Sequence, residues 1–141
     1  MNNKLAPIVV FAFNRPNLLR LCLDALSKNE EAKDCDLFVF VDGARECKES
    51  EDKKVAETIE IAKKAKGFRM LEVHISEKNK GLGTSIISGV TEIINQYDKV
   101  IVVEDDLVVM SNFLSFMNQG LEKYKEYSEI FSVCGYSNIV K

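Results

Sequence analysis

The apolar positions of the chain follow two spacings that replace each other along almost its whole length. Short runs rich in apolar and β-branched residues predict strands at 7–13, 36–41, 70–75, 99–103 and 130–136. Between them, apolar residues recur every three or four positions, as in amphipathic helices. Helices are predicted from Pro16, a residue that suits a first helical turn, and over 52–67, 84–97 and 111–127. Ser111 or Asn112 is expected to cap the last helix.

This alternation of strands and helices predicts an α/β fold with a three-layer, mostly parallel, Rossmann-like sheet that helices cover on both faces. In such sheets, ligands bind beyond the carboxyl ends of the strands, near the point where the strand order reverses. Polar residues follow each of the first four predicted strands, at 14–15, 42–45, 77–80 and 104–106. We therefore expect these four groups to share one rim.

Three adjacent acids, Glu104, Asp105 and Asp106, come directly after the fourth predicted strand. Burying three unpaired carboxylates together would be costly. A divalent cation such as Mn²⁺ or Mg²⁺ would remove the conflict, because such ions accept hard oxygen ligands and complete their shell with water and phosphate. Bound there, it could neutralise a diphosphate leaving group. The alternative is that the acids begin a solvated turn, and the triplet in isolation favours neither interpretation.

The other rim residues also allow two interpretations each. Asp42 can accept a hydrogen bond from a base N–H or a ribose hydroxyl, although an Asp-Gly turn is the commoner role. Arg15 can hold phosphate or stack near a base, or lie solvated at a helix start. The loop 79–83, with Asn79 and Lys80, offers backbone N–H groups to a phosphate, but it lacks the P-loop spacing.

Two residues are expected to have structural roles. His74, the only histidine, lies within a predicted strand. Gly89 lies within a predicted helix, where a missing side chain allows close packing on the sheet. Neither is expected to touch a ligand.

Composition narrows the class of protein. The 141 residues, 46% of them hydrophobic, suit one domain with a single core. A net charge of −3 with scattered Lys and Arg argues against a nucleic-acid partner. The longest apolar run, 6–13, is too short to span a membrane, and no signal-peptide pattern follows it. The four cysteines form no close pair, which predicts free thiols in a reducing cytoplasm and no zinc site.

Four segments together resemble a known family. They are PIVVFAFNRPNLLRLCLDAL, FVFVDGAR, NKGLG and KVIVVEDDLVVMSNFLSFM. They resemble the nucleotide-binding half of a GT-A glycosyltransferase, and most closely the N-acetylglucosaminyltransferase I (alpha-1,3-mannosyl-glycoprotein 2-beta-N-acetylglucosaminyltransferase) family with its bacterial relatives. The resemblance covers nearly the whole chain, and the EDD block, a form of the DXD motif, is its most specific part.

The resemblance implies a UDP-sugar donor and a Mn²⁺ or Mg²⁺ ion, with Asp106 as the direct metal ligand. It also implies further donor contacts: Glu104 and Asp105 on the sugar and ribose side, Asp42 at the uracil, Arg15 at the nucleotide, and Asn79 and Lys80 along the pocket.

Family members carry a second half that binds the acceptor and supplies the general base. Because this chain ends at Lys141, residues 1–141 are expected to form a nucleotide-sugar-binding domain without the acceptor half. The acceptor and the catalytic base stay unassigned, sugar transfer by the isolated chain is expected to be poor, and an uncovered sheet edge would favour self-association or a partner.

Two other classes of protein compete with an enzyme. One is a non-catalytic nucleotide-sugar-binding module that acts with a partner chain. The other is a flavodoxin-like signalling receiver, which is disfavoured because its acid pair follows the first strand, whereas here that strand ends in NRP.

Overall fold

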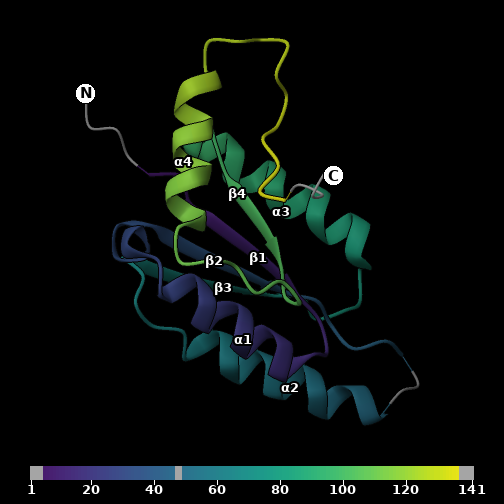
Figure 1. The fold of residues 1–141 in the computed structure, drawn as a ribbon. Helices are drawn as coiled ribbons and strands as arrows, with labels where there is room; N and C mark the ends of the chain where they lie inside the picture. The colour runs from purple at the N-terminus through teal and green to yellow at the C-terminus, as the bar shows by residue number, and fades with distance from the viewer. Residues whose placement is uncertain (1–4, 47–48, 137–141) are drawn as a thin grey trace, which may run out of the picture.

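The computed structural model describes residues 5–46 and 49–136 as a four-stranded parallel sheet with helices on both faces (Figure 1). The strands are β1 (Ile8–Ala12), β2 (Asp36–Val41), β3 (Met70–Ile75) and β4 (Ile101–Glu104). The helices are α1 (Pro16–Ser27), η1 (Glu30–Asp34, a 3₁₀ helix), α2 (Glu49–Lys63), α3 (Leu82–Tyr97) and α4 (Phe113–Tyr124). The predicted α/β class with a parallel, Rossmann-like sheet is confirmed.

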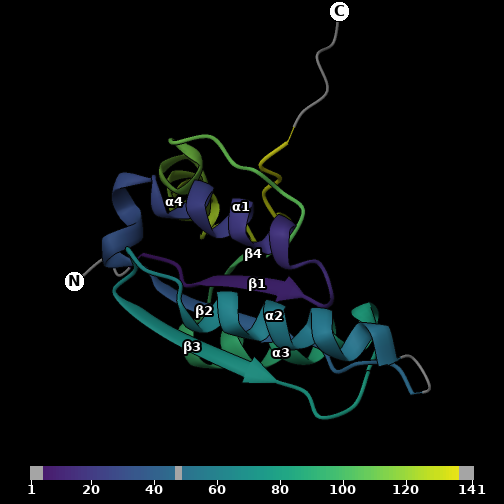
Figure 2. The same cartoon turned by 90° about the horizontal axis from the view of Figure 1, so that it is seen from below.

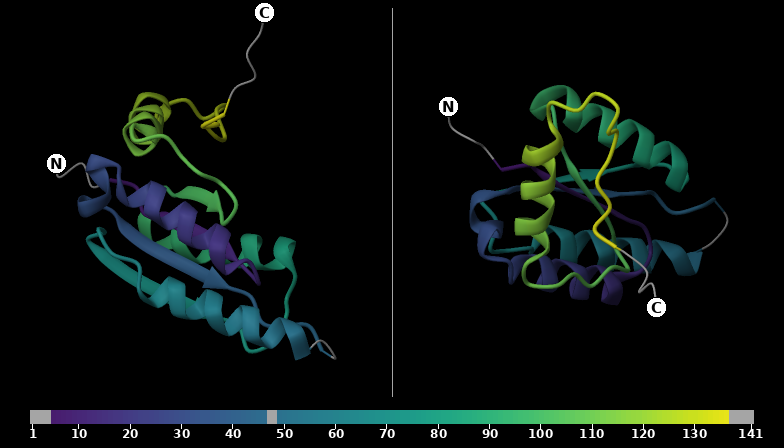
Figure 3. Two further views of the ribbon diagram at one scale, coloured as in Figure 1. Left: turned by 60° about the horizontal axis from the view of Figure 1, so that its bottom comes forward. Right: turned by 45° about the horizontal axis from the view of Figure 1, so that its top comes forward.

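The two faces of the sheet bury separate apolar clusters. Ile8 and Val10 of β1 belong to a cluster that includes residues of α1, α2 and α4, whereas Val9 and Phe11 belong to a smaller cluster with α3. Figures 2 and 3 show α1 and α2 on one side of the strands and α3 on the other. Every residue of β1 is buried, as the continuous apolar run predicts for a central strand.

The strands lie in the order β3-β2-β1-β4, so the chain adds β2 and β3 on one side of β1 and β4 on the other. The point where the strand order reverses therefore lies between β1 and β4. The pairing of these two strands runs on past the end of β4, because the Asp105 N–H donates to the carbonyl of Phe11 at 3.1 Å. On the other side of β1, the Asp42 N–H donates to the carbonyl of Ala12 at 3.0 Å. The residues that follow β1, β2 and β4 are thereby held side by side.

The predicted fifth strand at 130–136 is wrong. These residues form no regular element, and Phe131 is fully exposed. A strand needs a neighbour for its backbone groups, but this segment packs on α4 instead: Val133 lies against Gly120, and Gly135 lies against Phe113. Val133 is the one partly buried residue of this segment, and the other six are exposed.

The helix boundaries differ from the predicted ones at several ends. α2 begins at Glu49 and ends at Lys63, where hydrogen bonds from Lys64 to Ile61 and from Ala65 to Ala62 tighten the chain before Gly67. No side-chain cap forms at Asn112. Instead, the buried Asn29 caps α4 from a distance, since its Oδ1 accepts from the Leu114 N–H at 2.9 Å.

Gly89 and His74 have the structural positions that the sequence indicates. A Cβ on Gly89 would lie 2.8 Å from the Phe11 ring and 3.2 Å from the Phe40 ring. His74 stacks on Phe40 with ring centroids 4.3 Å apart. Both residues therefore hold α3 and the edge of the sheet together.

Gly89→Ala is expected to lower the free energy of unfolding by about 1–2 kcal/mol. Overpacking a core costs roughly 1–3 kcal/mol, and the better helix propensity of alanine offsets part of it. Gly83→Ala is the matched control in the same helix, because a Cβ there meets none of the described atoms within 4 Å. Urea unfolding of the two variants measures the difference, and equal stability would contradict the close contact.

Candidate functional site

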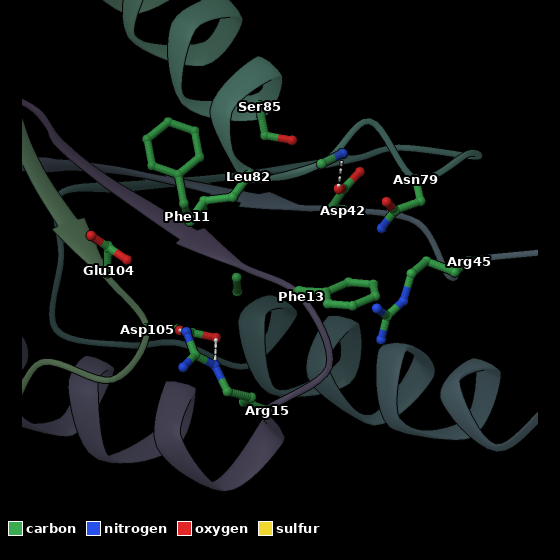
Figure 4. Close-up of a pocket in the computed structure, with 12 residues that line it drawn as sticks. Phe11, Phe13, Arg15, Asp42, Arg45, Asn79, Leu82, Ser85, Glu104 and Asp105 are labelled. Carbon is green, nitrogen blue, oxygen red and sulfur yellow. Dashed lines mark hydrogen bonds and ion pairs between the residues drawn. The ribbon is translucent and has the colours of Figure 1, made fainter. Parts of the chain in front are cut away.

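A cavity of about 220 Å³ opens at the carboxyl ends of β1, β2 and β4, beside the start of α3 (Figure 4). Five of the seven residues predicted to hold donor or metal line it: Arg15, Asp42, Asn79, Glu104 and Asp105. Lys80 and Asp106 are chain neighbours of this set, but they do not belong to the lining. The structure thus brings residues from four separate segments to one place.

Arg15 forms ion pairs with both acidic residues that follow β4, Asp105 and Asp106. The guanidinium holds Asp105 through both carboxylate oxygens, with Nε 3.3 Å from Oδ2 and Nη2 bonded to Oδ1. Its Nη1 lies 3.0 Å from Oδ2 of Asp106. The Asp105 side chain is 1% exposed, whereas those of Arg15 and Asp106 are 44% and 42% exposed. One arginine therefore bridges a buried acid and an exposed one.

The electrostatics of Asp105 follow from its burial. Desolvation raises the pKa of this carboxyl above its ordinary value, against the opposing effect of Arg15 and of the Phe13 N–H, which donates to it. Replacing Arg15 alone would leave the carboxylate buried and unpaired, which is strongly destabilising. We therefore assign the Arg15–Asp105 pair to the framework of the site.

The donor set fits a divalent cation only in part. Within the described residues, no group of three or more His, Cys, Asp or Glu side chains could hold a metal ion. Asp105 is fully engaged by Arg15, but Asp106 is half exposed and binds Arg15 through one oxygen only. Mg²⁺ and Mn²⁺ commonly use one or two carboxylates and take their other ligands from water and substrate phosphates. The residues therefore fit a cation that arrives with a phosphate, not a preformed protein cage.

Asp42 acts as a clamp for the loop before α3. Its Oδ1 accepts from the backbone N–H groups of Gly43 and Lys80 at 3.0 and 2.9 Å, and its Oδ2 accepts from that of Gly81 at 2.9 Å. The residue is 7% exposed. Lys80 thus contributes its backbone to the site. Oδ2 keeps one acceptor position, because a carboxylate oxygen can accept two hydrogen bonds.

The loops after β2 and β3 approach each other closely at Gly43. A Cβ on this residue would lie 2.7 Å from the Lys78 carbonyl carbon and 2.8 Å from the Ser76 carbonyl oxygen. Asn79 fastens the contact, since its side-chain amide donates to the Gly43 carbonyl at 2.8 Å. Only glycine allows this approach, and the approach brings Asn79 to the cavity.

Several lining residues were not selected from the sequence. Phe13 presents its ring to the cavity, and the guanidinium of Arg45 lies 5.5 Å from the ring centroid. Ser85 lies one turn into α3, and its buried Oγ has no hydrogen-bond partner among the described residues. The helix α3 begins at Leu82, two residues before its predicted start, and Ser85 faces the strand ends from its first turn. No pattern in the sequence indicated this position.

Three cysteines are free in the described part of the chain, and Cys47 lies outside the described residues. Burial raises the pKa of Cys22, beside the acids, to about 12, and that of Cys35 to about 11. Iodoacetamide at pH 8 is therefore expected to label exposed Cys134 in the native protein and to spare Cys22 and Cys35 until urea is added. Peptide mapping by mass spectrometry reads this out. Native labelling of Cys22 at the rate of Cys134 would contradict its burial.

Comparison with known proteins adds the class of fold. No protein-family model matches the chain, and no curated protein matches it either. The chain superposes on the crystal structure of S. aureus TarS, a glycosyltransferase, with a TM-score of 0.55 and 14% sequence identity. The match covers 86% of this chain and 20% of the TarS chain. The chain therefore shares the fold of part of TarS, and it spans one fifth of the length of that protein.

Among the described residues, no helix combines the length and the apolar character that crossing a membrane requires.

Proposed function

We propose that the cavity binds a nucleoside-diphosphate sugar, specifically a UDP sugar, and that the chain is the donor-binding domain of a glycosyltransferase. One observation carries the proposal. Arg15, Asp42, Asn79, Glu104 and Asp105, each of which the motif resemblance to the N-acetylglucosaminyltransferase I family implies as a donor contact, line a single cavity in the structure. The fold shared with TarS supports the same class of reaction.

The cavity offers contacts for the base and for a hydroxyl of the ligand, but it is too small to enclose a whole nucleotide sugar. The free acceptor position on Asp42 Oδ2 can take the ring N–H of uracil, and the Phe13 ring offers an apolar surface for a base. The Ser85 hydroxyl, which lacks a partner among the described residues, can bond a hydroxyl of the ligand. A cavity of about 220 Å³ is smaller than the roughly 300–1,000 Å³ of pockets that enclose a whole ligand. Part of the donor therefore lies outside it.

Asp106 is the residue of this chain that would hold Mn²⁺ or Mg²⁺ in the proposal. The bound ion would stabilise the negative charge that develops on the diphosphate leaving group. Arg15 places a second positive charge at the same strand end. Glu104, which is exposed at the mouth of the cavity, would orient sugar hydroxyls in this proposal.

A second candidate is a nucleotide-sugar-binding module that works with a partner chain or with a second copy of this chain. It is favoured by the surface around β4, which pairs with β1 alone within the described residues. Val102, Leu107 and Met110 lie exposed there, and such surfaces commonly mark interfaces. Release of UDP from UDP-GlcNAc across an acceptor panel separates the two candidates, because only the enzyme shows turnover that depends on the acceptor.

Titration of UDP into the chain tests the proposed function. We expect binding with Mn²⁺ and much weaker binding after a chelator is added. ADP is expected to compete less well than UDP, because adenine presents no ring N–H to Asp42. Equal affinity with and without the metal would refute the role of the cation, and equal competition by ADP would refute the assignment of uracil.

A further inference from the structure

We infer that Arg15 competes with the divalent cation for Asp106, so that the metal binds well only together with a diphosphate. This inference rests on the proposed function and adds to it the order of events at the site. It gives Arg15 two roles: its single positive charge offsets part of the negative charge of the strand end while no ligand is present, and its Nη1 bonds phosphate once the ligands bind.

The two ion pairs of Arg15 differ in how easily they can be exchanged. Asp105 is 1% exposed and engages the guanidinium through both oxygens, so losing this contact would leave a buried charge unpaired. Asp106 is 42% exposed and makes a single contact, at 3.0 Å. Exposed ion pairs of this kind contribute little to stability. The Arg15–Asp106 contact is therefore the one that a ligand can replace.

Neither ligand meets a suitable site by itself. A divalent cation that approaches Asp106 meets the positive guanidinium of Arg15, which already bonds Oδ2 of that carboxylate. A diphosphate that approaches Arg15 meets the negative charges of Asp106 and Glu104. Each ligand is thus opposed by the charge that the other would neutralise.

Together the two ligands resolve the conflict. A phosphate oxygen can accept the hydrogen bond that Nη1 of Arg15 now donates to Asp106, which frees Oδ2 of Asp106 for the ion. The ion pair with Asp105 keeps the guanidinium in place. Binding of one ligand then strengthens binding of the other by the same factor.

Mn²⁺ alone, measured through the electron paramagnetic resonance signal of the free ion, tests the competition. Arg15→Gln by itself would leave the buried carboxylate of Asp105 without its ion-pair partner. The comparison therefore uses Asp105→Asn as the background. Adding Arg15→Gln to this background is expected to raise Mn²⁺ affinity about tenfold, since a unit charge next to the ligand is removed. Arg20→Gln in the same background is the matched control, because Arg20 is an exposed residue of the same helix, and we expect no change from it.

The same titrations with UDP present separate the two claims. We expect UDP to raise the Mn²⁺ affinity of the wild type strongly and that of the Asp105→Asn, Arg15→Gln variant little. Unchanged Mn²⁺ affinity after loss of Arg15, in a chain that still binds UDP with Mn²⁺, would overturn the competition and leave the proposed function standing. Failure of UDP to bind the wild type at any Mn²⁺ concentration would overturn the proposed function, and the coupling with it.

Discussion

Asp42→Ala is expected to weaken UDP binding about a hundredfold or more and to lower the free energy of unfolding by about 2–4 kcal/mol. The substitution removes the acceptor for three backbone N–H groups, those of Gly43, Lys80 and Gly81. Hydrogen bonds to a charged group contribute roughly 1.5–3 kcal/mol each, and water reaching the opened loop recovers part of the loss. Titration with UDP and Mn²⁺ measures the affinity, and urea unfolding measures the stability.

Two controls separate the clamp from a general effect of charge. Asp24→Ala removes an exposed carboxylate from α1, and neither quantity should change. Asp42→Asn keeps one carbonyl oxygen for Gly43 and Lys80 but turns a donor toward the Gly81 N–H, so an intermediate loss is expected. An Asp42→Ala protein as stable and as tight a binder as the wild type would show that the loop does not depend on this residue.

Asp106→Ala is expected to remove most of the metal-dependent part of UDP affinity, about a hundredfold, with a change in stability below about 1 kcal/mol. The proposed ion loses its protein ligand. Replacing even a residue that only hydrogen-bonds a metal ligand lowers metal affinity or activity roughly 10–100-fold. Stability changes little because the side chain is 42% exposed and its ion pair with Arg15 lies at the surface. UDP titrations with Mn²⁺ and with chelator, on wild type and variant, give the metal-dependent part.

Asp106→Asn serves as the shape-matched variant for this prediction. It keeps an oxygen for Arg15 but lacks the charge that holds a hard cation. We expect it to behave like Asp106→Ala in the presence of Mn²⁺. Full metal-dependent affinity in both variants would place the ion elsewhere.

The central strands β1 and β2 could be predicted because they are buried on both faces and their apolar runs are continuous. β3 and β4 are exposed at several positions, and their apolar and β-branched residues identified them. β2 and β3 occupy the predicted ranges, and β1 and β4 differ from theirs only at the ends. The strand predicted at 130–136 is wrong because apolar composition does not reveal whether a segment is buried in a sheet or, as here, largely exposed with a contact to α4 at Val133 and Gly135. The predicted helix boundaries are wrong where a residue distant in sequence caps the helix, as Asn29 does by accepting from the Leu114 N–H at the start of α4.

The candidate site could be predicted in its members but not in their contacts. Polar residues at strand ends identify a rim, and five of those selected line the cavity. The pattern leaves strand order open, so it did not reveal that β1 and β4 are neighbours and that Arg15 therefore meets Asp105. A divalent cation was one of two interpretations of the three acids, and the structure shows that the chain supplies part of the positive charge itself through Arg15.

Amide chemical shifts during a titration with UDP and Mg²⁺ test the central claim most directly, because they show where the nucleotide binds. We predict saturable shifts at the strand ends and loops around the cavity, in the ranges 13–15, 43–45, 80–85 and 104–106, and little change in the groove between α1 and α2 that Arg20, Lys53 and Lys64 line. Shifts confined to that groove, or no shifts at any ligand concentration, would contradict a nucleotide-sugar site at the carboxyl ends of the strands.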